Sequence, residues 1–278
     1  MNLGISHASL LQANLEGLID AVGTIPGASV NVAPHLYFEA RRQGCSDMAL
    51  RSLLTQAGTR VHAIDPLLRG LPGTPSPDTV PSGLTKYFIH GAEDCFSAAE
   101  ALGAEALYVS HFLGAATDVA ELIAAIDEIS GRAASHGLSV AIEFIPGTGI
   151  PDLAAATRIA EQISSTPVGI VVDLWHLART GGGIADIESL SPGRIHAVQM
   201  CDCSASAASL PPTIMAHRAL PGNGDLPICD LVAAALGNSP GARLEIEVIN
   251  PELQALPPRQ AVTRMISAAH RSLDRLSI

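Results

Sequence analysis

The stretch Ile195-His196-Ala197-Val198-Gln199-Met200-Cys201-Asp202 is a short apolar run that closes on polar side chains. In a β-strand its side chains alternate, so Ala197 and Gln199 share one face while Val198 and Met200 share the other. We therefore expect Gln199 near the carboxyl end of a strand, on the face whose other members are small or apolar.

Three other strand-like runs, at 138–143, 168–173 and 242–247, close on the carboxylates Glu143, Asp173 and Glu247. A buried carboxylate without a partner is costly, because burial disfavours its ionised form. Any one of these acids alone is explained as a capped or salt-bridged strand end. Four polar strand ends that converge predict instead that a cation is their common partner.

Apolar runs alternate with helix-like segments along all 278 residues, and no linker interrupts the pattern. The expected strands are 3–7, 28–33, 60–65, 106–111, 138–143, 168–173, 195–199 and 242–247. The expected helices are 15–22, 46–57, 92–102, 117–136, 151–164, 184–190, 228–236 and 258–276. This order predicts the α/β class, with residues 1–278 forming a single-domain closed (β/α)8 TIM barrel.

The active site of such a barrel lies at the carboxyl ends of its strands, so the four polar strand ends should meet at one mouth. Three carboxylates and an amide oxygen form a hard set of ligands. This set favours Mn²⁺ or Mg²⁺, with Co²⁺ or Zn²⁺ as further candidates. The sequence therefore predicts one divalent metal held by Glu143, Asp173, Gln199 and Glu247.

The composition excludes several classes of partner. The formal net charge is −11 and the sequence contains no basic run, which argues against nucleic acid and anionic membranes as ligands. The first residues show neither a signal peptide nor a spanning helix. The five cysteines are an odd number without paired zinc spacing, so we expect reduced thiols in a cytoplasmic protein.

Two long loops are expected, at 66–83 and 203–227. The first is rich in proline and glycine, and it is either a lid over the substrate or an ordinary surface loop. The second contains Arg218 beside a Pro-Gly-x-Gly turn. Its planar guanidinium suits a carboxylate or phosphate of the substrate, and the alternative is a salt bridge with Asp225 or Asp202.

Four histidines lie at or near the ends of the first four expected strands: His7, His35, His62 and His111. A histidine in such a place is most often a hydrogen-bonded wall residue, but the mouth geometry sets His111 and His7 apart from the others. Of these two, His111 is the candidate substrate contact. Glu245 lies on the same face as Glu247 and one layer deeper. We expect it to be structural and paired with Arg243 or another inward basic group.

The motifs of the second half resemble those of the xylose isomerase-like TIM barrel superfamily. They are Glu143 after its strand, Asp173-Leu-Trp-His176, Ile195 to Asp202, Arg218-Ala-Leu-Pro-Gly-Asn-Gly-Asp225 and Ile246-Glu247-Val. The superfamily includes sugar and sugar phosphate isomerases and epimerases, inosose and 3-dehydroshikimate dehydratases, and apurinic endonucleases. The first half resembles it only in strand order and length.

The resemblance implies that Glu143, Asp173, Gln199 and Glu247 hold the metal and that Glu143 and Glu247 also move the proton. It implies that His176 orients a substrate oxygen. The usual residue at the place of Gln199 is histidine. Glutamine there argues against the multi-zinc endonuclease arrangement and is similar to some dehydratase-like members.

The expected function is a metal-dependent isomerase or epimerase that abstracts a proton next to a carbonyl. Its substrate would be a small sugar, sugar phosphate, ketose, keto acid or related polyol. The alternatives are a dehydratase of the 3-dehydroshikimate or inosose type, an endonuclease-like enzyme, and a non-catalytic sugar-binding barrel. Homo-oligomers are common among such enzymes, although no residue pattern here indicates one.

Overall fold

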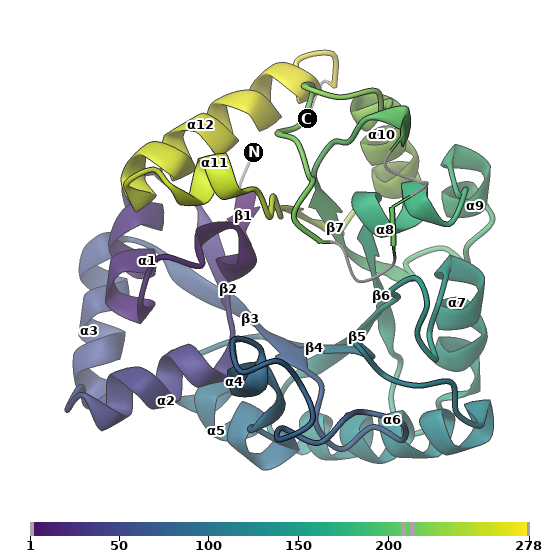
Figure 1. The fold of residues 1–278 in the computed structure, drawn as a ribbon, viewed down its shortest axis with the longest axis horizontal. Coiled ribbons are helices and arrows are strands. Elements are labelled where there is room, and N and C mark those ends of the chain that lie inside the picture. Colours follow the sequence, from purple (N-terminus) through teal and green to yellow (C-terminus); the bar gives the residue numbers. More distant parts are fainter. Residues whose placement is uncertain (1–2, 207–209, 212–214, 277–278) are drawn as a thin grey trace.

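The computed structural model describes residues 3–206, 210–211 and 215–276, and its eight parallel strands close into a barrel in sequence order (Figure 1). Each strand pairs with the next, and the first pairs with the last. The strands are β1 (Leu3–Ile5), β2 (Ser29–Val32), β3 (Arg60–Leu67), β4 (Ala106–Ser110), β5 (Ser139–Glu143), β6 (Gly169–Asp173), β7 (Ile195–Met200) and β8 (Arg243–Ile246). The predicted TIM barrel is confirmed.

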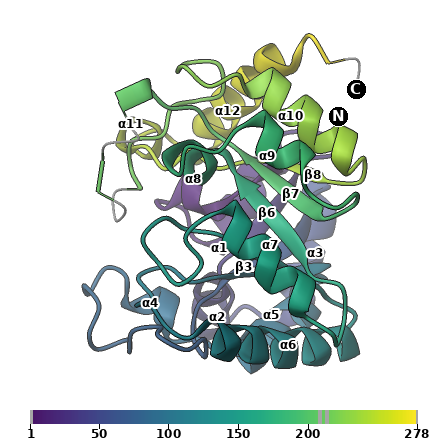
Figure 2. The same ribbon diagram turned by 90° about the vertical axis from the view of Figure 1, so that its right-hand side faces the viewer.

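Helices surround the barrel and cover the outward side of its strands (Figures 1 and 2). They are α1 (Leu15–Val22), α2 (Pro34–Arg42), α3 (Asp47–Ala57), α4 (Thr85–Phe88), α5 (Ala92–Leu102), α6 (Val119–Ser135), α7 (Leu153–Gln162), α8 (Leu174–Arg179), α9 (Ile184–Glu188), α10 (Ile228–Asn238), α11 (Pro251–Gln254) and α12 (Pro258–Leu273). A 3₁₀ turn, η1 (His7–Leu10), follows β1. Within the described residues, each helix is too short or too polar to cross a lipid bilayer.

The hydrophobic core lies mainly between the strands and the helices, where Val198 and Met200 of β7 pack outward. The barrel interior is a separate small cluster, whose members are Ala63, Ala106, Tyr108, Ala141, Val171 and Ala197. Ala197 belongs to this interior, and the alternation of β7 places Gln199 on the same face. Small side chains leave the interior room for buried polar groups above and below them.

The strand register places the polar strand ends along one rim of the barrel. Asp173 of β6 pairs with Gln199 of β7, which in turn pairs with Glu245 of β8. Glu143 ends β5 and pairs with Ser110 and Val171 of its two neighbours. Since parallel strands all end at the same rim, residues far apart in the sequence meet there.

The expected one-to-one alternation of strands and helices is wrong in detail, because the described part contains additional short helices. The segment that begins at Pro34 forms α2, with proline in the first turn, where its missing N–H costs nothing. The short helix α8 follows β6 directly, whereas α4 and α11 lie in the connections after β3 and β8. The loop expected at 66–83 gives its first two residues to β3 and otherwise contains no helix or strand.

Gly4 in β1 marks how tightly the interior is filled. A Cβ at this position would lie 2.8 Å from Cγ of Glu245 and 2.9 Å from Cε1 of His62. Both neighbours are fully buried, so they have little room to move away.

We expect Gly4→Ala to lower the free energy of unfolding by about 1–3 kcal/mol, the usual cost of overpacking. Urea denaturation measures this loss. Gly237→Ala in α10 is the matched control, because a Cβ there has nothing within 4 Å, and it should stabilise by up to about 1 kcal/mol. Equal effects of the two substitutions would contradict a tightly filled interior.

Candidate active site

The polar strand ends predicted from the sequence meet at the carboxyl rim of the barrel. Asp173 and Gln199 are fully buried, whereas Glu143 and Glu247 retain 7% and 6% exposure. Glu143 is the last residue of β5 and Asp173 the last residue of β6. Gln199 is the last but one residue of β7, and Glu247 comes directly after β8. The geometric basis of the predicted site is therefore present.

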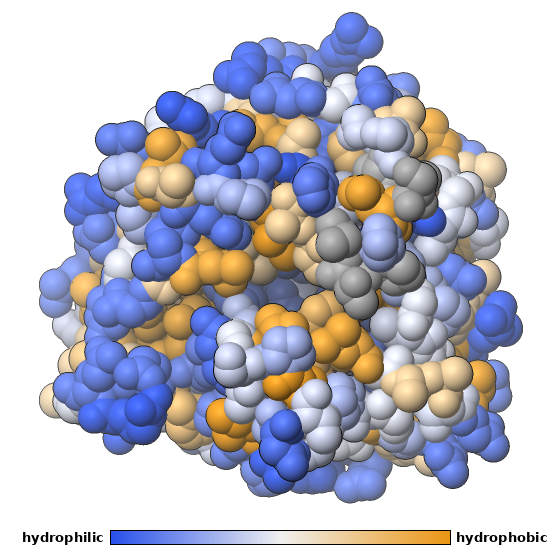
Figure 3. Space-filling model, viewed as in Figure 1, coloured by the Kyte–Doolittle hydropathy of each residue, from blue (hydrophilic) through white to orange (hydrophobic). Residues whose placement is uncertain are grey.

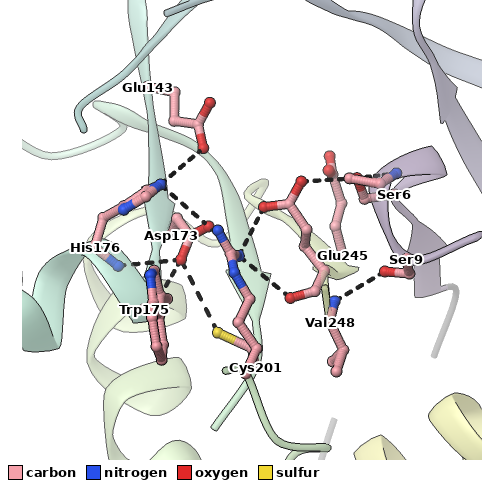
Figure 4. Close-up of polar contacts among 12 residues, drawn as sticks. Ser6, Ser9, Glu143, Asp173, Trp175, His176, Cys201, Glu245 and Val248 are labelled. Carbon is pink, nitrogen blue, oxygen red and sulfur yellow. Dashed lines mark hydrogen bonds and ion pairs between the residues drawn. The ribbon is translucent and has the colours of Figure 1, made fainter. Parts of the chain in front are cut away.

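A tight group within this rim consists of Glu143, Asp173 and His176, which offer ligand atoms within 4.8 Å of one another (Figure 4). Nε2 of His176 lies 3.6 Å from Oε1 of Glu143 and 3.8 Å from Oδ2 of Asp173. Asp173 also caps α8, since its Oδ1 accepts the backbone N–H groups of Trp175 and His176. The start of α8 therefore fixes His176 beside the carboxylates.

Arg218 is buried and links two of the strand ends. Its Nη1 lies 2.5 Å from Oδ2 of Asp173 and 2.8 Å from Oε2 of Glu247, while Ser6 donates a 2.9 Å hydrogen bond to the other oxygen of Glu247. The guanidinium carbon of Arg218 lies over the Trp175 ring, 5.9 Å from the ring centre. The alternative partners Asp225 and Asp202 are not those of Arg218. Asp202 instead accepts backbone N–H groups of its own loop.

Burial and crowding shift the titration of the site. Burial, followed by the charges of Glu247 and Asp65, raises the pKa of Glu143 well above its usual value. The pKa of Asp65 is raised in the same way, and burial raises that of Glu247 although Arg218 opposes the shift. Burial and the charge of Arg218 lower the pKa of His176 well below its usual value. At neutral pH His176 is thus a neutral imidazole that can act as a ligand.

Two buried side chains lack partners in a way that fits a metal. Both amide atoms of Gln199 and both ring nitrogens of His176 have no hydrogen-bond partner within the described residues. Buried polar atoms are rarely left unpaired, so these are available to another ligand. Together with Glu143 and Asp173 they form a donor set that suits a divalent metal. The residues present therefore fit the metal that the sequence predicts.

A cavity of about 280 Å³ opens beside this group, and Glu143 and Glu247 both line it. Figure 3 shows a hollow at the centre of the face, bordered by apolar side chains. Ile145, Ile249 and Phe112 are among the apolar residues of the wall. The cavity thus combines reactive carboxylates with an apolar enclosure, as small-molecule sites do.

The structure places His111 away from this cavity. Its Nε2 lies 2.7 Å from the carbonyl oxygen of Pro72, and its Nδ1 accepts the backbone N–H of Gly149 at 2.9 Å. Both ring nitrogens are therefore engaged in joining two loops, and burial lowers its pKa. The prediction that His111 contacts substrate finds no support in this geometry.

Glu245 is a structural residue in the interior, and of the two partners considered it has another inward basic group, His62, and not Arg243. Arg243 pairs with Glu105 at the amino ends of β8 and β4. Glu245 instead accepts a hydrogen bond from the Tyr108 hydroxyl and lies 3.0 Å from Nε2 of His62. Burial alone would raise the pKa of Glu245, but these two groups outweigh it and lower the pKa.

Two charged residues of the cavity wall, Asp65 and Lys86, were not among the predicted site residues. Asp65 lies in β3 where the expected strand closed, which is the signal that identified the other three acids. Lys86 of α4 is the only lysine in the sequence, among sixteen basic residues. The other fifteen basic residues are arginines, and lysine and arginine are not interchangeable. The presence of a single lysine could therefore have marked Lys86 as a candidate site residue.

The fold and the site define a class of (β/α)8 barrels whose mouth gathers buried carboxylates and a histidine in a donor set suited to a divalent metal. Within that class the chain belongs to the xylose isomerase-like TIM barrel family, whose profile matches residues 26–268.

The comparisons with individual proteins agree with this assignment. The inosose isomerase of Halalkalibacterium halodurans is 24% identical over 141 residues, and the match spans about half the length of each chain, 49% of both. The crystal structure of an IOLI protein with a bound zinc atom superposes with a TM-score of 0.82 at 16% identity, and the match covers 100% of both chains. A D-psicose 3-epimerase gives a TM-score of 0.69 at 15% identity, covering 98% of this chain and 99% of the other.

We expect Arg218→Met to lower the free energy of unfolding of the metal-free protein by about 3–5 kcal/mol at pH 7.5, because it leaves buried carboxylates without their cation. The pKa values of Glu143 and Glu247 are raised in the folded state. Their protonation therefore contributes to the free energy of unfolding at acidic pH, and this contribution is lost as the pH rises above the ordinary carboxylate range toward the raised pKa values. The deficit should therefore shrink at pH 5.5, as urea denaturation at the two pH values would measure.

Arg179→Met is the matched control for this experiment, because Arg179 is the other arginine over the Trp175 ring. It removes the same side chain and charge. A loss for Arg218→Met that is the same at both pH values, or that Arg179→Met reproduces, would contradict the electrostatic account.

Proposed function

We propose that this protein is a divalent-metal-dependent isomerase or epimerase of a small keto-polyol. The observation that carries the proposal is the cavity itself, since Glu143 and Glu247 both line it next to the group formed by Asp173 and His176. Two carboxylates on one small cavity can act as the general base that removes a proton from carbon and the general acid that returns it. The family membership and the inosose isomerase relative support this reaction class.

Each glutamate is held so that it can work as an acid or a base. Ser6 and Arg218 fix the two oxygens of Glu247, and Nε2 of His176 lies near Glu143. The pKa values of both glutamates are raised above the usual range, which brings them closer to neutral pH, where proton transfer is most effective. We propose that one takes the proton next to the carbonyl and the other returns it.

The proposed metal ligands are Glu143, Asp173, Gln199 and Glu247, with His176 adjacent as a further donor. The metal would supply Lewis-acid polarisation of the substrate carbonyl. The oxygen-rich set favours Mn²⁺ or Mg²⁺ in our proposal, and the zinc in the similar IOLI structure keeps Zn²⁺ as the alternative. We also propose a cytoplasmic location and no nucleic-acid partner, from the cysteine usage and the net charge of −11.

The substrate should be small and without a strong negative charge near the reacting carbon. The cavity of about 280 Å³ is slightly below the range of about 300–1,000 Å³ of drug-sized ligand sites. The charge of Arg218, which suggested an anionic substrate, is already used by Asp173 and Glu247. This favours a neutral keto-polyol such as an inosose or a ketose over a keto acid.

A dehydratase is the second candidate, because loss of a β-hydroxyl also begins with proton abstraction next to a carbonyl. The structure of the probable 3-DHS dehydratase AsbF from Bacillus anthracis superposes with a TM-score of 0.64 at 12% identity, covering 95% of this chain and 98% of that one. The engagement of Arg218 makes a carboxylate-bearing substrate the weaker choice.

We expect the Mn²⁺-loaded protein to incorporate solvent deuterium next to the carbonyl of 2-keto-myo-inositol or a ketose such as D-fructose, as mass spectrometry or NMR in D₂O would detect. Glu143→Gln and Glu247→Gln should lower this exchange by about 10²–10⁴-fold, because each removes a proton-transferring group. Glu161→Gln on the exposed side of α7 is the control and should leave it unchanged. Release of water in place of exchange would favour the dehydratase, and neither reaction would contradict the proposed class.

We expect Gln199→His to shift metal preference from Mn²⁺ toward Zn²⁺, because an imidazole nitrogen replaces an oxygen donor. Titration calorimetry with each metal measures the two affinities. Gln199→Leu is the companion variant and should weaken binding of both metals. Unchanged affinities in both variants would show that Gln199 is no ligand.

A further inference from the structure

A buried hydrogen-bond network lies beside the carboxylates and ends at His7. Nδ2 of Asn31 donates to Oδ2 of Asp65 at 2.8 Å and to Oε2 of Glu245 at 3.3 Å. Oδ1 of Asn31 accepts the backbone N–H of His7 at 2.9 Å and lies 3.1 Å from Nδ1 of the same residue. Asn31 thus connects the structural interior at Glu245 to the 3₁₀ turn that begins at His7.

The orientation of the Asn31 amide follows from this network. The backbone N–H of His7 can only donate, so the Asn31 atom that faces it must be the oxygen. The amide nitrogen then faces Glu245, whose lowered pKa keeps it an ionised acceptor. Exchanging the two amide atoms would place two donors against each other on one side and two acceptors on the other.

This orientation fixes the proton on the His7 ring. Because Nδ1 faces the oxygen of Asn31, it must carry the proton, and Nε2 of the neutral ring is then the unprotonated nitrogen. Burial lowers the pKa of His7, so the neutral form is the main one at pH 7. His7 lines the same cavity as Glu143 and Glu247, and among the described residues no hydrogen bond to its Nε2 is found.

We propose that His7 is a catalytic residue whose Nε2 carries a proton between two substrate oxygens, which commits the proposed function to isomerisation. When a carbonyl moves to the adjacent carbon, one hydroxyl must lose its proton and the former carbonyl oxygen must gain one. His7 takes the first proton on Nε2 and gives it to the second oxygen. Glu143 and Glu247 move the carbon-bound proton, so the reaction is balanced without an oxidant or a reductant.

Asn31 is the positioning residue in this scheme, because it holds the His7 ring and does not itself transfer the proton. Epimerisation at a carbon next to the carbonyl would leave every oxygen with the proton it began with. A histidine held as a proton acceptor at the cavity therefore has a use in isomerisation that it lacks in epimerisation. This inference rests on the proposed function and names its outcome more narrowly.

The first test needs no substrate. In ¹⁵N-histidine-labelled protein, the signals of His7 are identified as those missing from His7→Ala. Ring nitrogen shifts should report a neutral His7 with its proton on Nδ1 at pH 7. A proton on Nε2, or a doubly protonated ring, would overturn the inference.

The second test separates the two proton transfers, with 2-keto-myo-inositol and D-fructose as probes and Mn²⁺ present. His7→Ala should keep deuterium exchange at carbon within about 3-fold of the wild type, because the glutamates remain. It should lower formation of the isomerised product by about 10²-fold, with KM nearly unchanged, and added imidazole should restore part of that rate. Asn31→Leu should lower kcat in the same reaction.

His35→Ala is the matched control. His35 also lies against Tyr87, at 4.7 Å between ring centres, but it lines the neighbouring groove and not the site cavity. Mn²⁺ affinity of His7→Ala should match the wild type, and thermal unfolding should show that the variant, although less stable, is folded at the assay temperature. Equal losses of deuterium exchange and of isomerised product in His7→Ala would overturn this inference but leave the proposed function standing. A wild-type protein that exchanges no deuterium with either probe would overturn the proposed function, and this inference with it.

Discussion

The mouth of this barrel depends on the contact of one guanidinium with two carboxylates. Glu143, Asp173 and Glu247 are brought together by strand register, and two like charges about 4 Å apart repel by about 4 kcal/mol at an effective dielectric constant of about 20. That is comparable with the net stability of a folded domain, about 5–15 kcal/mol. Arg218 offsets the repulsion from within the core. Asp173 and Glu247 are also proposed metal ligands, so Arg218 and the metal would interact with the same carboxylates.

The barrel interior explains how polar chemistry is supported from below. Its apolar cluster is mostly alanine, which leaves space for Tyr108 and for the carboxylate of Glu245. Glu245 in turn orients Asn31, and Asn31 holds His7. The barrel interior is therefore not only a hydrophobic core. Through Asn31, the buried carboxylate of Glu245 helps to orient the His7 ring at the cavity.

Much of the fold followed from the sequence because strands and helices of a (β/α)8 barrel carry strong local patterns. The period-two pattern of β7 placed Gln199 inward, and common strand ends placed Glu143, Asp173 and Glu247 at one rim. The partner of Arg218 could not be predicted, because the path of a long loop is set by tertiary contacts that leave no periodic signal.

The short helices show the same limit. One turn is too short for a periodic pattern, so α4 and α8 were missed even though α8 brings His176 to Glu143. Sequence position also could not tell His111, which joins two loops, from His7, which faces the cavity. Asp65 was a different kind of omission, since its strand carried the signal and only its role was overlooked.

The position of Lys86 has a practical consequence. Because it is the sole lysine of the sequence and lies on the cavity wall, an amine-directed reagent has one side-chain target, and that target borders the site. Apart from the terminal amine, every fluorophore, spin label or crosslinker attached through amine chemistry would report from this wall of the cavity. The molecule thus offers a single built-in attachment point from which occupancy of its mouth can be followed without engineering.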